Sequence, residues 1–264
     1  MAHINDSRRL TGLNLQSPGP GAVTDVAFTA LEDSDAFLQG WSTALDALFT
    51  ELGWPRMARW VRRFAGGASL VIDAPLDALY AATEINEWAV QSALGTAIPI
   101  DEVVRTIQAS LETESNPSLT ALQEAAAARS VPFVWDDDFV SLGLGRTSQT
   151  WSATNLPHPD ELDWTDFHPI PFAYVTGTNG KTTTTRMAMS ILRAANISHA
   201  GTSSDGVVVN GVEVEQGDWT GPGAARMALR HPDVDMAILE TARGGLLRRG
   251  LVLDGCDAAV ITNI

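Results

Sequence analysis

Residues 174–186, with the sequence YVTGTNGKTTTTR, constrain the fold more strongly than any other stretch of the chain. The stretch opens with β-prone residues, carries Gly177 and Gly180 in a short turn, and continues past Lys181 into a run, TTTTRMAMSILRAA, that favours a helix. A strand, a glycine-bearing turn, Gly-Lys-Thr and a helix follow one another in phosphate-binding loops. The sequence therefore predicts a nucleotide phosphate site where a strand meets a helix.

Lys181 is the only lysine among the 17 lysine and arginine residues. Lysine presents a compact charge on a flexible stem, whereas the planar guanidinium of arginine fits a tight loop poorly. Glycine lets backbone N–H groups approach phosphate oxygens, and the start of a helix adds partial positive charge. The general pattern G-x-x-x-x-G-K-[ST] needs a glycine where the chain has Val175, so the match is incomplete. A chance turn in an arginine-biased chain is the alternative explanation.

Composition argues against several classes of protein. A net charge of −15 disfavours a nucleic-acid-binding protein, which normally presents a basic face. No apolar run approaches the ~18 residues of a membrane span, and the opening MAHINDSRRL lacks the apolar stretch of a signal peptide. We therefore expect a cytoplasmic protein with no membrane or nucleic-acid partner. The only cysteine, Cys256, lies beside an apolar segment and is expected in the core.

Residues 1–151 are expected to form an α+β domain. Apolar residues at helical spacing predict four helices, within residues 33–54, 74–94, 99–112 and 116–130. Asp73 is a candidate cap for the second helix, and Asn116, followed by proline, is a candidate N-cap for the fourth. Short apolar runs predict strands at 68–74 and 131–135.

Residues 152–170 are polar, acidic and proline-bearing, which is typical of a linker. From residue 171 onward, strands and helices are expected to alternate. The expected strands are 171–177, 235–240 and 257–264, and the expected helices are the one ending near 195 and 221–231. An Asn-Gly pair at 210 and 211 predicts a hairpin. The alternation indicates an α/β fold with a mostly parallel sheet and flanking helices.

Three expected strands end next to residues that suit a ligand site. Val175 precedes the glycine turn, Glu240 ends the segment DMAILE, and Asn263 follows the last apolar run. Ligands in parallel sheets bind outside the carboxyl ends of the strands. We therefore expect one crevice to bring these positions together.

The sequence VTGTNGKTTTT resembles the phosphate loop of the Mur ligase superfamily, whose pattern is T-G-T-N-G-K-T. The segments GTSSDGVVVNG, TGPGAARMAL and ILETARGGLLRRGL…CDAAVITNI narrow the resemblance to the Mur-ligase-like half of the cyanophycin synthetase family. Together they cover residues 171–264 almost continuously. RRLTGLNL and FVSLGLGRTSQTW are more loosely similar to the start of that family and to the stretch before its ATP-grasp domain. The resemblance implies an incomplete, P-loop-type Mur ligase central domain at 171–264, behind a cyanophycin-synthetase-like N-terminal domain.

The resemblance implies an ATP-dependent carboxylate–amine ligase. In such ligases ATP and Mg²⁺ convert a carboxylate, here of an acidic amino acid or peptide, into an acyl phosphate that an amine attacks. The implied catalytic residues are Lys181, Glu240 and Arg243, and the implied Mg²⁺ ligands are Thr182 and Glu240. The residues implied to bind the nucleotide are Gly177, Thr178, Asn179, Gly180, Lys181, Thr182 and Thr183.

Each role beyond the loop has a structural alternative. Glu240 is otherwise a surface glutamate or a cap for the TARGG turn, and Arg243 is otherwise an ordinary surface arginine. Residues 203–205, Ser-Ser-Asp, line the acceptor pocket or belong to a plain Asp-Gly turn. Arg248 and Arg249 are expected to be a solvated pair.

Two parts of the family's architecture are missing from the sequence. The family carries an ATP-grasp domain after the position of Trp151, where this chain continues directly into the linker. The chain also stops before the Asp-His motif and the C-terminal domain. We therefore expect the front half of a ligase, as a fragment or a truncated gene product. Successive addition of aspartate and arginine, the family's reaction, is not expected of this chain alone.

A non-catalytic nucleotide-binding protein, acting as a regulatory or assembly partner of a ligase, is the second hypothesis. An unrelated P-loop kinase or ATPase is a third, which the match over residues 240–264 disfavours. The oligomeric state stays open, and a homo-oligomer is among the alternatives.

Overall fold

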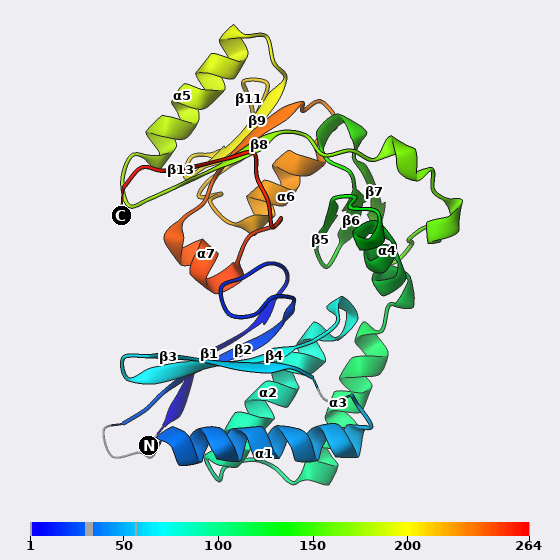
Figure 1. The fold of residues 1–264 in the computed structure, drawn as a ribbon, viewed down its shortest axis with the longest axis vertical. Helices are drawn as coiled ribbons and strands as arrows, with labels where there is room; N and C mark the ends of the chain where they lie inside the picture. The colour runs from blue at the N-terminus through cyan, green and yellow to red at the C-terminus, as the bar shows by residue number, and fades with distance from the viewer. Residues whose placement is uncertain (1, 30–33, 56, 264) are drawn as a thin grey trace. The chain divides into compact units, whose positions relative to one another are not determined.

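The computed structural model describes residues 2–29, 34–55 and 57–263, and the chain divides into two compact units, Met1–Pro117 and Ser118–Ile264 (Figure 1). The first residue of the earliest expected helix, 33, and the last residue of the final expected strand, 264, lie outside the described residues. The boundary differs from the sequence-based expectation of a domain ending at 151.

Unit 1 is an antiparallel sheet covered on one face by helices. The strand order is β1-β2-β4-β3, with β1 (His3–Leu10), β2 (Gly21–Ala27), β3 (Arg59–Phe64) and β4 (Gly67–Asp73). The helices are α1 (Ser34–Leu52), α2 (Leu79–Ala93) and α3 (Ile100–Glu114), preceded by the short η1 (Leu76–Ala78). Helix α2 lies against β1, β2 and β4, and packs between α1 and α3. This arrangement confirms the α+β class of the N-terminal part.

The capping prediction for the second helix is wrong. Asp73 is the last residue of β4, and the N-cap residue of α2 is Ala78, which forms no side-chain cap. The carboxylate of Glu114, at the end of α3, instead accepts hydrogen bonds from the amides of Tyr80 (2.7 Å) and Ala81 (2.8 Å). The first-turn amides of a helix lack intrahelical partners, so a carboxylate from another helix can satisfy them.

Unit 2 is built on a six-stranded sheet with the order β11-β10-β9-β12-β8-β13. Its strands are β8 (Phe172–Thr176), β9 (His199–Ser203), β10 (Gly206–Val209), β11 (Val212–Gln216), β12 (Met236–Glu240) and β13 (Ala258–Ile261). Strands β9, β12, β8 and β13 run parallel, which confirms the predicted mostly parallel sheet. The remaining pair, β10 and β11, is the predicted hairpin, with Asn210 (φ 50°) and Gly211 (φ 84°) in its turn.

Helices cover the two faces of this sheet. Helix α5 (Lys181–Ala194) packs on β8, β9 and β12, where Val175, Leu192 and Ile238 form a buried cluster. Helix α6 (Pro222–Arg230) packs on β9, β10 and β12. A short helix, α7 (Arg243–Arg249), follows β12. Strand β8 thus lies between β12 and β13, and its loop emerges beside the carboxyl ends of both neighbours.

Residues 118–151 belong to unit 2 because they pack on its core. Helix α4 (Pro117–Ala128), which begins at the predicted position, leads into a three-stranded antiparallel sheet of β5 (Phe133–Trp135), β6 (Phe139–Leu142) and β7 (Gln149–Ser152). Val134 and Leu144 share a buried cluster with Phe172 and Tyr174 of β8. Arg230 of α6 donates to a carboxylate oxygen of Asp136 at 2.5 Å. The short helical turns η2 (Gly145–Thr147), η3 (Pro159–Glu161) and η4 (Trp164–Asp166) complete this region.

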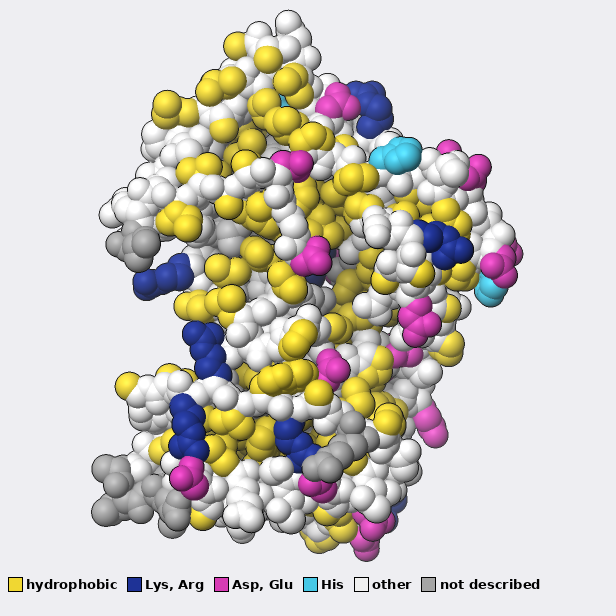
Figure 2. All heavy atoms as spheres, in the orientation of Figure 1, with side chains coloured by type: hydrophobic (Ala, Val, Ile, Leu, Met, Phe, Trp, Pro, Cys, Tyr) yellow, Lys and Arg dark blue, Asp and Glu magenta, His cyan; other side chains and the backbone are white. Residues whose placement is uncertain are grey.

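Cys256 is exposed, so its predicted core position is wrong. It precedes β13, the last strand at one edge of the sheet, whose four residues are all exposed. On the face that Figure 2 shows, lysine and arginine side chains form small separate groups among acidic and apolar side chains. Within residues 2–29, 34–55 and 57–263, no helix is long and apolar enough to cross a membrane.

Candidate functional site

The turn between β8 and α5, residues 177–180, is here called the glycine loop. Gly177 has a φ of +136° and Gly180, the N-cap residue of α5, has a φ of +83°, conformations that favour glycine. A Cβ atom at Gly177 would lie 2.2 Å from the Thr262 hydroxyl oxygen and 3.0 Å from the backbone of Asn263. The glycine therefore lets the loop approach the residues that follow β13.

Lys181 is the first residue of α5, where the backbone amides face away from the helix. Its Nζ atom lies 3.4 Å from the carbonyl oxygen of Thr178, a long contact within the same loop. The first helical hydrogen bond of α5 runs from the amide of Thr184 to Gly180. The amides of residues 181–183 have no acceptor in the described part of the chain. These donors, the Lys181 charge and the helix dipole together suit a bound anion.

Thr182 and Glu240 meet at the carboxyl edge of the sheet. The Thr182 hydroxyl donates to Glu240 Oε1 at 3.2 Å and lies 3.1 Å from the Ser204 hydroxyl. Glu240, the last residue of β12, is only 3 % exposed, and its Oε2 atom has no hydrogen-bond partner among the described residues. A buried carboxylate oxygen without a partner is rare in proteins and calls for a specific explanation.

Burial raises the pKa of Glu240 above its ordinary value of 4.5. The hydrogen bond from Thr182, the positive charge of Lys181 and the nearby backbone amide of Ser204 act in the opposite direction, because all three stabilise the ionised carboxylate. The negative charge of Asp205 adds to the upward shift. The carboxylate of Glu240 thus lacks a counter-charge strong enough to offset its burial.

A magnesium ion suits this oxygen cluster. Mg²⁺ prefers oxygen ligands, is held by one or two carboxylates, and keeps several waters. Glu240 supplies one carboxylate with an unpartnered oxygen, and Thr182 supplies a hydroxyl beside it. No group of three or more His, Cys, Asp or Glu side chains arranged for a metal occurs among the described residues. The donor set is therefore typical of a metal shared with a phosphate rather than of a protein-only metal cage.

The end of β13 completes the site. The Asn263 Oδ1 atom accepts hydrogen bonds from the amides of Thr178 (2.8 Å) and Asn179 (3.0 Å) in the glycine loop. The loop, Glu240 and Asn263 therefore lie at one edge of the sheet, as the positions of the strand ends predicted. The contacts of Asn263 and of its neighbour Thr262 with the loop are not evident from the sequence, because they depend on the register between β8 and β13.

The other candidate residues differ in exposure and in whether they contact this cluster. Arg243 is the first residue of α7, and its exposed side chain forms no hydrogen bond or ion pair with the described residues. Thr183 is also exposed. Ser204 contacts Thr182, whereas Asp205 forms an ion pair with Arg186 of α5, at 2.5 Å.

The remaining candidates of the sequence analysis show no direct part in the cluster. Ser203 is buried at the end of β9, and its hydroxyl accepts a hydrogen bond from the amide of Asp205. Arg248 and Arg249 are exposed in the last turn of α7.

Comparisons with known proteins relate one part of the chain to a known family. Residues 175–264 match the Mur ligase middle domain. Cyanophycin synthetase of Synechocystis sp. is 52 % identical over 95 residues, which are 36 % of this chain and 11 % of that protein. The enzymes of Crocosphaera subtropica and Geminocystis herdmanii are 48 % identical over 95 residues and 50 % identical over 101 residues.

The aligned segments cover 36 % and 38 % of this chain, and 11 % and 12 % of those two enzymes. The matched part of the chain thus spans about a tenth of the length of these relatives. Residues 175–264 contain the glycine loop, α5, Glu240 and the end of β13, so the site lies within the segment that matches the family model. Residues 175–264 therefore carry the sequence of a Mur ligase middle domain and are similar to segments of cyanophycin synthetases.

Proposed function

We propose that the glycine loop and the start of α5 bind the phosphates of ATP, and that Thr182 and Glu240 hold the accompanying Mg²⁺. The observation that carries the proposal is the buried Glu240 carboxylate, which contacts Thr182 through one oxygen and leaves the other without a partner. Lys181 neutralises charge on the β- and γ-phosphates, as a lysine does in phosphate-binding loops. The backbone donors to the phosphates are the amides of the first turn of α5, residues 181–183.

We further propose that the site serves a carboxylate–amine ligase acting on an acidic amino acid or peptide. ATP supplies the phosphoryl group that turns the substrate carboxylate into an acyl phosphate, from which an attacking amine displaces phosphate. Lys181 stabilises charge that develops during phosphoryl transfer and keeps the transferred group in line. Arg243, exposed beside the same sheet edge, clamps the acidic substrate through bidentate hydrogen bonds. The family match and the names of the relatives support this class of reaction.

A second function is a nucleotide-binding protein without ligase activity. It needs only the phosphate and metal contacts of the glycine loop, Thr182 and Glu240. Both functions need the same phosphate site. They differ in whether ATP is consumed when a carboxylate and an amine are supplied.

Calorimetric titration with ATP and Mg²⁺ tests the phosphate site. We expect the Lys181→Ala variant to bind ATP roughly 10- to 100-fold more weakly than the unmodified chain, because a charge-assisted contact is lost. Arg105→Ala, which removes an exposed positive charge from α3 in unit 1, is the matched control and is expected to bind normally. Equal affinities of the Lys181→Ala variant and the unmodified chain would refute the proposed site.

The ligase and the non-catalytic protein are distinguished by turnover. ADP formation that requires both an acidic amino acid or peptide and an amine supports the ligase. ATP binding with no such turnover supports the non-catalytic alternative.

A further inference from the structure

The two residues after β13 hold the glycine loop from its side. The amide of Thr262 donates to the carbonyl oxygen of Thr176 at 2.9 Å, and its hydroxyl lies 3.2 Å from the same oxygen. That hydroxyl also donates to the carbonyl oxygen of Asn179, at the far end of the loop. Thr262 therefore ties together the two ends of the turn that connects β8 to α5.

Asn263 contacts the amide groups of the same loop, whereas Thr262 contacts carbonyl groups. Its Oδ1 atom accepts from two successive loop amides, those of Thr178 and Asn179. Together, Thr262 supplies donors to loop carbonyl groups and Asn263 supplies an acceptor to loop amides. Gly177 makes this approach possible, since any larger residue there would collide with Thr262.

Strand β12 fixes the other side of the loop base. The amide of Thr241 donates to the carbonyl oxygen of Val175 at 2.8 Å, and the Thr176 hydroxyl donates to the carbonyl oxygen of Thr241 at 2.8 Å. The end of β8 is thus anchored to the residue that follows β12, whereas the loop, apart from its contacts with α5, is held by the two residues after β13.

We infer that Thr262 and Asn263 are positioning residues that pre-form the glycine loop for the polyphosphate of the nucleotide. This inference rests on the proposed function. Because the amides of Thr178 and Asn179 are engaged by Asn263, the phosphate oxygens are left to the amides of residues 181–183 and to Lys181. A loop already held in its bound conformation loses less conformational entropy when the ligand binds.

A competing interpretation is that the Asn263 oxygen occupies donors that a phosphate would otherwise use. Two observations favour positioning over competition. The Thr262 hydroxyl donates to the carbonyl oxygens of Thr176 and Asn179. A phosphate is an acceptor at neutral pH, so it cannot take the place of this donor. Gly177 also packs directly on Thr262, so the loop and the end of β13 form one continuous contact.

The experiment compares three variants of the end of β13 with one control. Asn263→Ala removes the acceptor for both amides, Asn263→Asp keeps an acceptor but adds a negative charge, and Thr262→Val removes the donor hydroxyl while preserving side-chain shape. Asn155→Ala alters an exposed asparagine outside the site and is the matched control. Amide exchange of Thr178 and Asn179 is measured by NMR without nucleotide, and ATP–Mg²⁺ affinity by calorimetry.

We expect Asn263→Ala to speed exchange of the two amides by roughly tenfold, because their acceptor is gone, and to weaken ATP binding by a similar factor. Asn263→Asp should restore slow exchange but leave ATP binding weak, since a carboxylate beside the polyphosphate repels it. Thr262→Val should weaken ATP binding with unchanged global stability. Asn155→Ala should change neither measurement.

Three results would overturn the inference. Tighter ATP binding by Asn263→Ala would identify the side chain as a competitor of phosphate. Unchanged exchange in Asn263→Ala would show that the contact does not order the loop. ATP affinity of Asn263→Ala and Thr262→Val equal to that of the unmodified chain, with Lys181→Ala still impaired, would leave the phosphate site intact and remove only the positioning role.

Discussion

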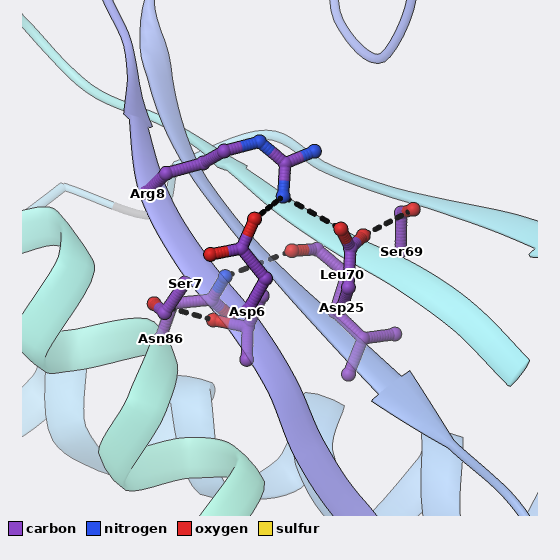
Figure 3. A network of polar contacts seen from close by, with 8 residues as sticks. Asp6, Ser7, Arg8, Asp25, Ser69, Leu70 and Asn86 are labelled. Carbon is purple, nitrogen blue, oxygen red and sulfur yellow. Dashed lines mark hydrogen bonds and ion pairs between the residues drawn. The ribbon is translucent and has the colours of Figure 1, made fainter. Parts of the chain in front are cut away.

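Two carboxylates, one in each unit, are satisfied to very different degrees. In unit 1, Asp25 of β2 accepts from Arg8 at 2.6 Å and from the Ser69 hydroxyl at 2.6 Å, so both of its oxygens are used (Figure 3). In unit 2, Glu240 accepts from Thr182 through one oxygen, and the other has no partner among the described residues. The Asp25 side chain is 21 % exposed, whereas Glu240 is 3 % exposed.

The more deeply buried carboxylate is therefore the less satisfied one. A carboxylate that serves only stability is expected to have its oxygens paired in proportion to its burial, because an unpaired buried charge is costly. Asp25 fits that expectation, since it links three neighbouring strands through Arg8 and Ser69. Glu240 does not, which points to a partner outside the chain. Disrupting the contacts of Asp25 should therefore lower stability and leave ligand binding unchanged. Substituting Glu240 should impair ligand binding without a comparable loss of stability.

The largest expected effect is on ligand binding at Glu240. Replacing Glu240 by glutamine removes the negative charge while keeping a similar shape, and we expect ATP affinity in the presence of Mg²⁺ to fall by at least ~100-fold. Calorimetric titration with and without Mg²⁺ measures the change. Glu124→Gln, on the exposed face of α4, is the matched control. A Glu240→Gln variant that still binds ATP more tightly when Mg²⁺ is added would contradict the metal assignment.

The next effect is on stability at the Asp25 network. Arg8→Ala removes the guanidinium that lies 2.6 Å from Asp25 and 3.0 Å from Asp6, so two neighbouring carboxylates lose their common counter-charge. We expect the free energy of unfolding to fall by about 2 kcal/mol. Urea denaturation measures it, with Arg62→Ala on the neighbouring part of the sheet as an exposed control. If Arg8→Ala lost ATP binding but kept its stability, the contrast between the two carboxylates would be wrong, because Asp25 would then have a functional role.

The smallest expected effect is the pH dependence of stability without metal. The pKa of Glu240 is raised in the folded state, so the folded protein binds its proton more tightly than the unfolded chain. The contribution of Glu240 to the free energy of unfolding should therefore decrease as pH rises from near 4.5 through the raised folded pKa. Urea denaturation with a chelator at several pH values, for the unmodified chain and Glu240→Gln, isolates this contribution. If the free energy of unfolding of both proteins changed with pH in the same way, burial of the ionised Glu240 carboxylate would not lower the stability of the fold.

Much of the fold was accessible from local sequence patterns. The helices of unit 1, the Asn210-Gly211 hairpin and the parallel strands ending at Thr176 and Glu240 follow from apolar spacing and turn residues. Strand β1, HINDSRRL, was not predicted because its polar residues make side-chain interactions across the sheet rather than forming an apolar run. The packing of residues 118–151 with unit 2 was not predicted, because Arg230 reaches Asp136 and the carbonyl groups of Val134 and Phe139, contacts between residues more than 90 positions apart.

Site residues that belong to a recognisable motif were predicted from the sequence. Residues that reach the site only through the pairing of β13 with β8 were not. Lys181 and Thr182 were predicted from the Gly-Lys-Thr turn between a strand and a helix, and Glu240 chiefly from the resemblance to the Mur ligase family. The loop contacts of Thr262 and Asn263 were not, since nothing in a polar Thr-Asn pair distinguishes it from an ordinary strand end. Pairing of Ile261 with Thr176 puts the next two residues beside the glycine loop, and only the folded sheet reveals this.

The position of Lys181 gives the molecule an unusual chemical property. Apart from the α-amino group, its Nζ atom is the single primary amine of the chain, and it sits at the start of α5 beside the glycine loop. An amine-directed label would thus attach at one internal place, within the loop itself. The yield of that one modification would report whether a ligand covers the glycine loop, without altering any residue.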